Sequence, residues 1–256
     1  MAQLSTTGEQ AALLRRLHHG RHILVLPNAW DVASARALAA VPGVHALATT
    51  SGGVARSLGF EDEERAPREE MLRAATRIAS AVSLPVTADL EAGYGDPVGT
   101  AESAWEGGIA GVNFEDSPSG VLRPVDEQVA AIREIRAAVP ALVINARVDV
   151  FLRAAGGIEE AVVRGNAYLA AGADCVYPIT CPAGAIPELV RRLDGPMNVL
   201  LTPGGPAPCE LEELGVARAT WGSGLAGAAY AAAAQAVAAA LSGGSPDERR
   251  AGPPES

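Results

Sequence analysis

Carboxylate side chains follow three consecutive apolar runs of this sequence. The run in VTADLEAGYGD ends in Asp89 and Glu91, the run in VNFEDS ends in Glu115 and Asp116, and LVINARVD ends in Arg147 and Asp149. Acids brought together in this way repel one another unless a cation lies among them. Carboxylate oxygens, bound directly or through water, are the ligands of a hard divalent ion such as Mg²⁺, with Mn²⁺ as the alternative. The pattern therefore predicts an oxygen-ligated metal site.

The same acids also have an ordinary structural interpretation. Acids at strand ends cap the helix that follows, as Asp96 and Asp126 can, and Asp149 can pair with Arg147 or Arg153. Each acid taken alone is explained equally well in this way. The joint pattern on three neighbouring strands favours the metal site.

Short β-branched or apolar runs predict the elements that position these residues. Eight strands are expected, at residues 23–26, 45–49, 85–90, 110–115, 142–147, 174–179, 197–201 and 217–222. Helical spacing lies between them, at residues 32–40, 68–82, 98–106, 125–138, 158–171, 183–193, 209–214 and 224–241. Alternating strands and helices predict a parallel sheet covered by helices, and eight such units favour a closed (βα)8 barrel of the TIM type over an open doubly wound sheet. In such a barrel the active site lies where the strands end.

Missing residues exclude several chemistries. The sequence has no lysine, so a Schiff-base aldolase or a pyridoxal enzyme is excluded. Its four histidines, His18, His19, His22 and His45, precede or begin the first two strands, at the end of a barrel opposite the chemistry. A histidine-ligated zinc site is therefore not expected. Neither a dinucleotide fingerprint nor a P-loop occurs.

Charge and composition indicate the class of partner. A net charge of −10 disfavours nucleic acid and anionic lipid, which leaves small molecules as the expected ligands. Three cysteines without paired spacing, and a start without a signal-peptide core, predict a reduced, cytoplasmic protein. The run GLAGAAYAAAAQAVAAAL approaches the length of a membrane span, but alanine is weakly apolar and a closely packed helix is the better interpretation. We expect one barrel domain over residues 1–241 and a disordered tail over residues 242–256.

Five motifs in this order resemble the isocitrate lyase and phosphoenolpyruvate mutase superfamily: LPNAWDVASA, ATTSGGVARSLG, TADLEAGYGD, GVNFEDS and NARVDVFL. The likeness runs from about Leu24 to Leu241. It implies an α/β barrel whose last helix is often exchanged between subunits, and therefore a homodimer or homotetramer. It also implies a Mg²⁺ site for a 2-oxo or 2-hydroxy carboxylate. In such enzymes the enolate of a pyruvate-like fragment is made or consumed as a carbon–carbon or phosphorus–carbon bond breaks.

The resemblance also implies roles for individual residues. Thr50, Ser51 and Gly52 match a turn that holds the substrate carboxylate, and Asp62 matches a further acid on the second βα loop. Asp89 and Glu91 match the pair around the metal, and Glu115 matches an acid of the metal shell. Arg147 matches the arginine that stabilises the enolate, Asn198 matches a polar group on the seventh strand, and Trp30 is placed to line the pocket.

The fourth βα loop departs from the family. Lyases of this family carry basic residues followed by Cys, Gly and His there, whereas this loop reads SPSGVLRPVDEQ. Without the thiol acid we expect poor cleavage of isocitrate and methylisocitrate. Tyr94 is the alternative source of a proton.

Three functions remain open after this departure. The first is decarboxylation of an oxaloacetate-like acid, in which solvent protonates the product. The second is phosphorus–carbon chemistry on phosphonopyruvate, aided by Asp62 or Thr180. The third, of another class, is a barrel that binds a keto acid without turning it over.

Overall fold

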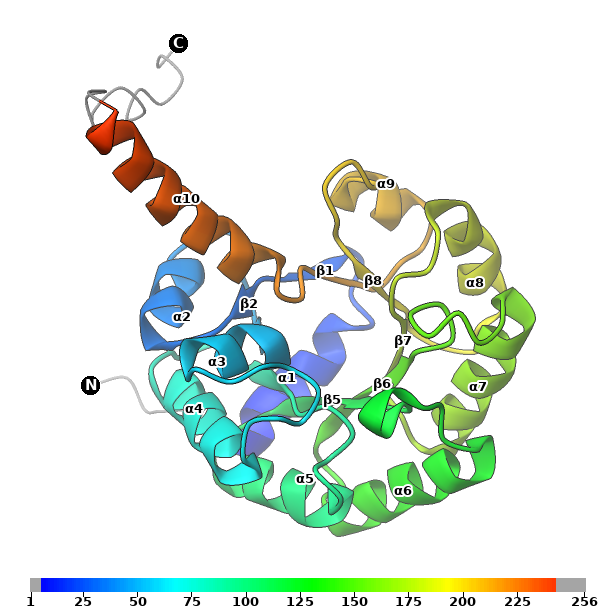
Figure 1. Cartoon of the computed structure of the whole chain (residues 1–256). Helices are drawn as coiled ribbons and strands as arrows, with labels where there is room; N and C mark the ends of the chain where they lie inside the picture. The colour runs from blue at the N-terminus through cyan, green and yellow to red at the C-terminus, as the bar shows by residue number, and fades with distance from the viewer. Residues whose placement is uncertain (1–5, 243–256) are drawn as a thin grey trace.

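The strands of the protein form a closed ring surrounded by helices (Figure 1). The structure is a computed structural model that describes residues 6–242, so the predicted tail lies, but for its first residue, outside the described part. The strands are β1 (Leu24–Leu26), β2 (Asn28–Ala29), β3 (Leu47–Thr49), β4 (Val86–Asp89), β5 (Gly111–Glu115), β6 (Val143–Val148), β7 (Cys175–Pro178), β8 (Asn198–Leu200) and β9 (Arg218–Thr220). The predicted TIM-type barrel is confirmed, and the expected strands are found within a few residues of their predicted bounds.

Every ladder between neighbouring strands is parallel. One sheet has the order β2-β3-β4-β5-β6-β7 and the other β1-β9-β8. A bridge between Val176 and Met197 joins β7 to β8, and at the other junction β1 and β2 are separated by Pro27 alone. Proline has no amide hydrogen to donate to a ladder, so one strand of the ring is divided in two. Counted around the ring, β1 and β2 occupy one position, which gives the eight positions of the barrel.

Helices cover the outside of the ring. They are α2 (Val32–Ala39), α3 (Ser51–Ser57), α4 (Arg68–Ser80), α5 (Pro97–Glu106), α6 (Val125–Ala138), α7 (Ile158–Ala171), α8 (Ile186–Arg192), α9 (Pro208–Glu213) and α10 (Gly224–Leu241), with short 3-10 turns η1 (Pro118–Gly120) and η2 (Ala183–Ala185). All eight predicted helices are present, and α3 occupies a segment for which the sequence indicated only a glycine-rich turn.

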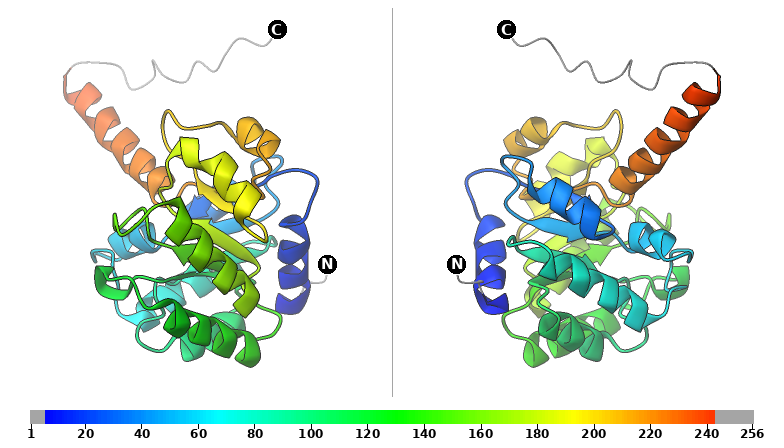
Figure 2. Two further views of the ribbon diagram at one scale, coloured as in Figure 1. Left: turned by 90° about the vertical axis from the view of Figure 1, so that its right-hand side faces the viewer. Right: turned by 90° about the vertical axis from the view of Figure 1, so that its left-hand side faces the viewer.

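An additional helix, α1 (Thr7–Leu17), closes the amino ends of the strands (Figure 2). Thr6 and Glu9 form a capping box that starts the helix, and Leu14 is fully buried beneath the ring. Arg15 ties the helix to the start of β7 through an ion pair of 2.7 Å with Asp174. Because α1 closes this end, chemistry is confined to the opposite one.

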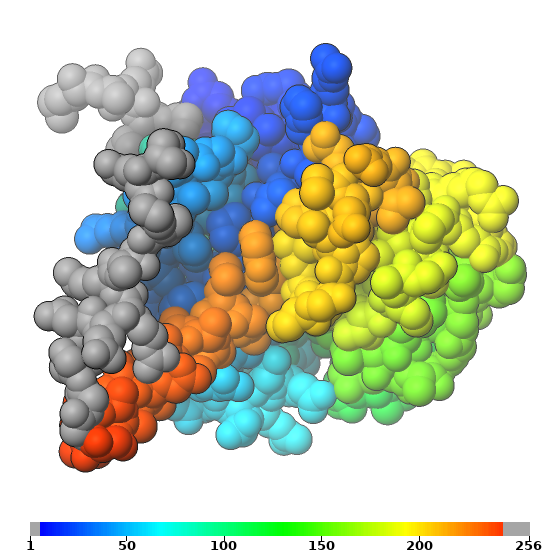
Figure 3. Space-filling view, turned by 90° about the horizontal axis from the view of Figure 1, so that it is seen from above, coloured from blue at the N-terminus to red at the C-terminus, as the bar shows by residue number. Residues whose placement is uncertain are grey.

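The last helix, α10, extends away from the barrel (Figures 2 and 3). Of its residues only Ala226 is buried, while Val237 and Leu241 are 60% and 84% exposed. Its length and composition would suffice to cross a membrane, with 6% of the segment buried in the structure. A groove of about 360 Å³ lies over the outer face of β1 and has an apolar lining that includes Val25 and Val41.

Candidate active site

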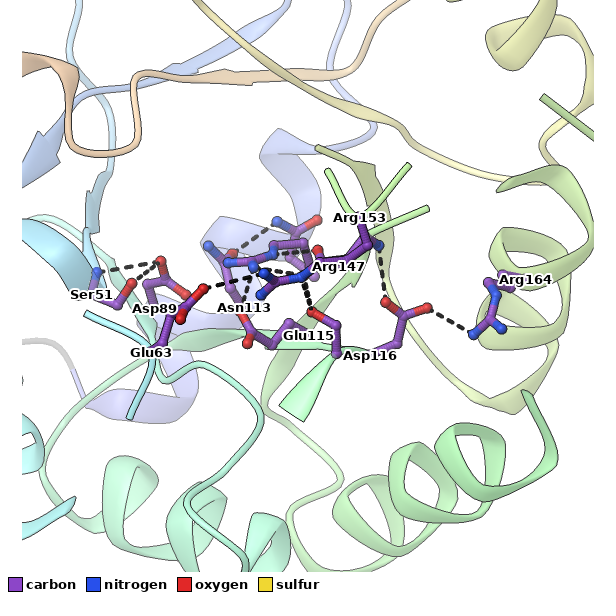
Figure 4. Close-up of polar contacts among 12 residues, drawn as sticks. Ser51, Glu63, Asp89, Asn113, Glu115, Asp116, Arg147, Arg153 and Arg164 are labelled. Carbon is purple, nitrogen blue, oxygen red and sulfur yellow. Dashed lines mark hydrogen bonds and ion pairs between the residues drawn. The ribbon is translucent and has the colours of Figure 1, made fainter. Parts of the chain in front are cut away.

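The strand register directs the predicted acids and the predicted arginine into the barrel. Asp89 on β4 is paired with Asn113 on β5, and Glu115 on β5 is paired with Arg147 on β6. Partners in a ladder point to the same face, and here that face is the interior. These side chains therefore gather at the carboxyl end of the barrel, opposite α1 (Figure 4).

Asp89 carries the least satisfied carboxylate of the group. Its Oδ2 accepts hydrogen bonds from the amide and hydroxyl of Ser51 at 3.3 and 3.1 Å, but its buried Oδ1 has no partner in the described structure. Burial raises the pKa of Asp89, and the charge of Arg147 lowers it only in part. An unpaired buried carboxylate oxygen is costly, so Oδ1 is a vacant acceptor for a cation or a water.

Glu91 is held by two loops. Its Oε1 accepts from the Tyr94 hydroxyl at 2.7 Å and its Oε2 from the Glu64 amide at 2.5 Å. The Glu64 side chain in turn accepts a hydrogen bond from the Tyr94 amide at 2.6 Å. Burial raises the pKa of Glu91 to about 7, with the Tyr94 hydrogen bond opposing the shift. Glu91, Tyr94 and Glu64 all have positive φ angles. The backbone of these three residues is therefore strained, and such strain clusters at functional sites.

Arg147 lies between two carboxylates. Its Nη2 is 2.5 Å from Glu115 Oε2, and its guanidinium also pairs with Asp149. Burial lowers the pKa of Arg147, but the hydrogen bonds to Asp149 and the charge of Glu115 more than compensate, so the pKa rises and the cation is permanent. Burial raises the pKa of Glu115 against the effect of Arg147. The Arg147 guanidinium therefore keeps its positive charge beside Asp89, held in place by the carboxyl groups of Glu115 and Asp149.

A second buried network supports this pair from behind. Asp116 Oδ1 accepts from the Asp149 amide at 2.9 Å, and its Oδ2 accepts from Tyr168 at 2.7 Å and from Arg164 at 3.1 Å. Asp116 and Asp149 are both fully buried. A network whose members are all satisfied holds its side chains in one geometry.

The donor set suits a cation bound mainly through water. Within residues 6–242, no three His, Cys, Asp or Glu side chains are grouped closely enough to hold a metal ion directly. Mg²⁺ commonly keeps several waters and uses only one or two carboxylates. The unpaired Oδ1 of Asp89 fits one direct contact.

The turn that opens α3 lies next to Asp89. Thr50 accepts from the Gly53 amide at 3.4 Å, and its hydroxyl is 2.8 Å from that of Ser223, which follows β9. A Cβ atom at Gly52 would come within 2.6 Å of Asp62 Oδ2 and 2.9 Å of Ser223 Oγ. A larger residue there would require the Asp62 or Ser223 side chain to shift, and the close approach places the Asp62 carboxylate beside this turn although the residue itself is exposed.

Two other predicted residues are located further from the acids. Trp30 packs against Tyr230 of α10, with ring centroids 6.2 Å apart. Asn198 is fully buried and donates to Thr220 at 3.2 Å, so its amide is engaged within the barrel. Within residues 6–242, neither side chain forms a hydrogen bond with Asp89.

The expected pairing of Asp149 with Arg147 is confirmed, because residues two apart on a strand share a face. Other residues that shape the site were not predicted. Ser223 had no signal in the sequence, since 173 positions separate it from Thr50. Glu64 likewise meets Glu91 only through the path of the loop.

Known proteins with related sequences and structures share this architecture. Residues 14–241 match the family described as phosphoenolpyruvate phosphomutase. An uncharacterized protein of Mycobacterium tuberculosis (strain H37Rv) is 39% identical over 226 residues, which cover 85% of this chain and 86% of that protein. The 2,3-dimethylmalate lyase of Eubacterium barkeri is 31% identical over 227 residues, covering 80% of this chain and 77% of that enzyme. A crystal structure from Burkholderia cenocepacia J2315, described provisionally as a phosphonomutase, has a TM-score of 0.82 at 39% identity and covers 91% of this chain and 99% of its own.

Proposed function

The chain belongs to the isocitrate lyase and phosphoenolpyruvate mutase superfamily, and we propose that it is a Mg²⁺-dependent lyase that forms the enolate of a small 2-oxo or 2-hydroxy acid by carbon–carbon bond cleavage. Decarboxylation of an oxaloacetate-like acid is the simplest form of this reaction. The observation that carries the proposal is the vacant, buried Oδ1 of Asp89 beside the fixed cation of Arg147.

Asp89 would hold the metal directly, with Glu91 and Glu115 binding its waters. A bound divalent ion would supply a Lewis acid that takes up negative charge on the substrate oxygens. The chain itself provides Arg147, whose guanidinium is oriented before substrate arrives and therefore needs no reorganisation as the enolate charge develops. Ser51 and Gly52 would orient the proximal carboxylate next to Asp89, since oriented amide and hydroxyl donors suit an anion.

The loop between β5 and α6 bears on the fate of the enolate. Residues 116–124 contain no cysteine, histidine or lysine, so this loop offers no general acid of the usual kind. The Tyr94 hydroxyl is engaged in a hydrogen bond to Glu91, and burial raises the Tyr94 pKa, so this group is a poor proton donor. Protonation of the enolate by solvent fits these observations better than protonation by the loop.

A panel of acids with and without metal tests the proposal. Oxaloacetate, 2,3-dimethylmalate, methylisocitrate and phosphonopyruvate would be compared in Mg²⁺, in Mn²⁺ and after chelation. Metal-dependent release of pyruvate from oxaloacetate supports the first choice. Pyruvate and phosphate from phosphonopyruvate would instead favour phosphorus–carbon chemistry, for which Asp62 is the exposed candidate beside the site. Binding of these acids without turnover would favour the third function, a barrel that binds a keto acid without catalysing a reaction.

The uncovered α10 supports an assembly of at least two subunits. The part of the apolar helix beyond Tyr230, and an apolar groove over β1, are left uncovered in the described part of a single chain. Exchange of α10 between two copies would cover both surfaces, which is the arrangement that the family resemblance implies. We place such a homo-oligomer in the cytoplasm, because the three cysteines are free and lack disulfide partners among the described residues.

A further inference from the structure

An arginine from the loop after β6 reaches an acidic loop across the barrel end. Arg153 Nη1 lies 3.2 Å from Glu63 Oε1, and its Nε donates to the Ser117 hydroxyl at 3.1 Å. Figure 4 shows the Arg153 and Glu63 side chains directed toward one another. Ser117 is fully buried, whereas the Glu63 side chain is 58% exposed. The Arg153 guanidinium is thus fixed at Nε by the buried Ser117, whereas its Nη1 is paired with an exposed carboxylate that another anion can replace.

The Arg153 guanidinium lies under the short loop that follows β5. A Cβ at Gly120 would be 3.4 Å from Arg153 Nη1, so the η1 turn passes over this group. Ser117, which anchors Arg153, also donates to Asp149, the partner of Arg147. The two guanidinium groups therefore belong to one connected set of contacts at the carboxyl end of the barrel.

Arg147 and Arg153 differ in what surrounds their charges. Arg147 is paired with two buried carboxylates, Glu115 and Asp149. Arg153 is paired with the exposed carboxylate of Glu63, and a pair of this kind contributes little stability because water competes with it. An anionic group of a substrate can therefore displace Glu63 at low cost.

The backbone of the loop that carries Glu63 is held in place by its neighbours, while the Glu63 side chain remains exposed. Glu63 and Glu64 have φ angles of 65° and 57°, a conformation that non-glycine residues seldom adopt, and the Glu64 contacts to Tyr94 and Glu91 fix the loop. The Glu63 carboxylate thus stands beside Arg153 in the manner of a bound carboxylate ligand.

We propose that Arg153 binds the distal carboxylate of a dicarboxylic substrate, which replaces Glu63 at the guanidinium. This inference rests on the proposed function for the proximal end, where Ser51, Gly52 and Arg147 would meet the 2-oxo or 2-hydroxy acid. Arg153 then selects dicarboxylates over monocarboxylates. In an oxaloacetate-like acid the distal carboxylate is the group that leaves as CO2, so a cation paired with it stabilises the ground state more than the transition state. Loss of the contact should therefore raise KM without lowering kcat.

Binding of L-malate and L-lactate tests this assignment without any turnover, because the two acids differ only in the distal carboxylate. Dissociation constants in Mg²⁺ would be measured by calorimetry. In Arg153→Gln we expect L-malate to bind at least tenfold more weakly and L-lactate to change less than twofold, as for loss of one charge-assisted hydrogen bond. Glu63→Gln removes the internal competitor and should tighten L-malate two- to threefold. Arg73→Gln, which breaks the exposed pair with Glu70, is the matched control and should change neither acid.

Other outcomes overturn the assignment. Equal affinity of the unaltered protein for L-malate and L-lactate would contradict the inference. Equal weakening of both acids in Arg153→Gln would also contradict it, because it would show that Arg153 has only a structural role. If Arg153→Gln does not fold, unchanged L-malate affinity in Glu63→Gln counts against the inference. With oxaloacetate, Arg153→Gln should raise KM at least tenfold without lowering kcat. If Arg153 discriminates L-malate from L-lactate but no acid is turned over, the inference is upheld and the proposed reaction is refuted. If an acid is turned over but Arg153 does not discriminate the two ligands, the proposed reaction stands and the inference is refuted.

Discussion

Arg147 donates two parallel hydrogen bonds to Asp149, from Nε to Oδ1 at 2.6 Å and from Nη2 to Oδ2 at 2.7 Å. This bidentate contact fixes the plane of the guanidinium, and the backbone of Asp149 is fixed in turn by Asp116. Under the proposed function, Asp149 is thus a positioning residue for Arg147, the group that would face the enolate.

Asp149→Asn should therefore reduce kcat by about a hundredfold, the scale of losing one oriented donor. Steady-state kinetics with the best acid of the panel would measure this change, and circular dichroism would check that the fold is retained. Glu160→Gln, which alters the exposed partner of Arg164, is the control. If Asp149→Asn kept full kcat, Arg147 would not need this orientation.

Replacing Asp89 tests the metal assignment. Asp89→Asn keeps the shape of the side chain and removes the charge, so metal-dependent activity should disappear while the fold remains. The melting temperature should change little, because the lost carboxylate is costly to bury. Activity would be titrated against Mg²⁺ and Mn²⁺. An unchanged metal dependence in Asp89→Asn would falsify the assignment.

The barrel and the position of its acids could be predicted from sequence because both follow from local rules. Apolar runs alternating with helical spacing indicate βα units, and the carboxyl ends of parallel strands meet at one face. Asp89, Glu115 and Arg147 thus come together without any knowledge of side-chain contacts. The prediction fails where distant segments decide the local structure.

Three features illustrate this failure. The α3 segment carries Gly52 and Gly53, which indicate a turn, yet a Cβ at Gly53 would meet Trp30 at 3.1 Å, so close packing requires glycine inside a helix. The short α1 has mostly polar residues, and its burial depends on the open end of the ring beneath Leu14. The contact between Arg153 and Glu63 joins residues 90 positions apart and has no periodic signal.

Assembly is tested at the exposed face of α10. Val237 is 60% exposed in a single chain, so Val237→Asp should leave the barrel folded and weaken association if α10 is exchanged between copies. A charge buried at an apolar interface without a partner is strongly unfavourable. Light scattering at micromolar concentration should give at least twice the chain mass for the unaltered protein and a lower mass for the variant. A monomer mass for the unaltered protein would reject the exchange.

Activity should not depend on any thiol. Burial raises the pKa of Cys175 to about 12 and that of Cys181 to about 11, so both remain protonated near neutral pH, and Cys209 is exposed. Combined replacement of Cys175 by Ala and of Cys181 and Cys209 by Ser should keep kcat within about threefold. A lyase with a thiol acid would lose at least a hundredfold. Efficient methylisocitrate cleavage by this variant would show that another group, such as Tyr94, supplies the proton.

A buried histidine far from the site should control the acid sensitivity of the fold. His18 Nδ1 is 2.8 Å from the Leu14 carbonyl and must donate there, while Nε2 is 3.5 Å from Nη1 of Arg218 and must accept. Donation from Nδ1 is open to either protonation state, but acceptance at Nε2 requires a neutral ring. Burial, and next the charge of Arg218, lower the pKa of His18 from 6.5 to about 4, against the opposing effects of the Leu14 hydrogen bond and the charge of Asp174. Below pH 6.5, His18 therefore stays neutral in the native protein while the same residue is protonated in the unfolded chain.

The sign of the effect follows from the pKa of His18 in the folded and unfolded states. Above pH 6.5 the ring is neutral in both states and the contribution of His18 is constant, whereas between pH 6.5 and about 4 only the unfolded chain gains the proton. The free energy of unfolding should fall across this window by on the order of 3 kcal/mol, because a tenfold difference in proton affinity corresponds to about 1.4 kcal/mol. His18→Asn retains a donor for the Leu14 carbonyl and does not titrate. Urea unfolding at fixed protein concentration from pH 7.5 to 4.5 should give a flatter pH dependence for this variant, because the carboxylates that also titrate there are common to both proteins. Parallel curves for the two proteins would show that His18 is protonated in the native state as readily as in the unfolded one.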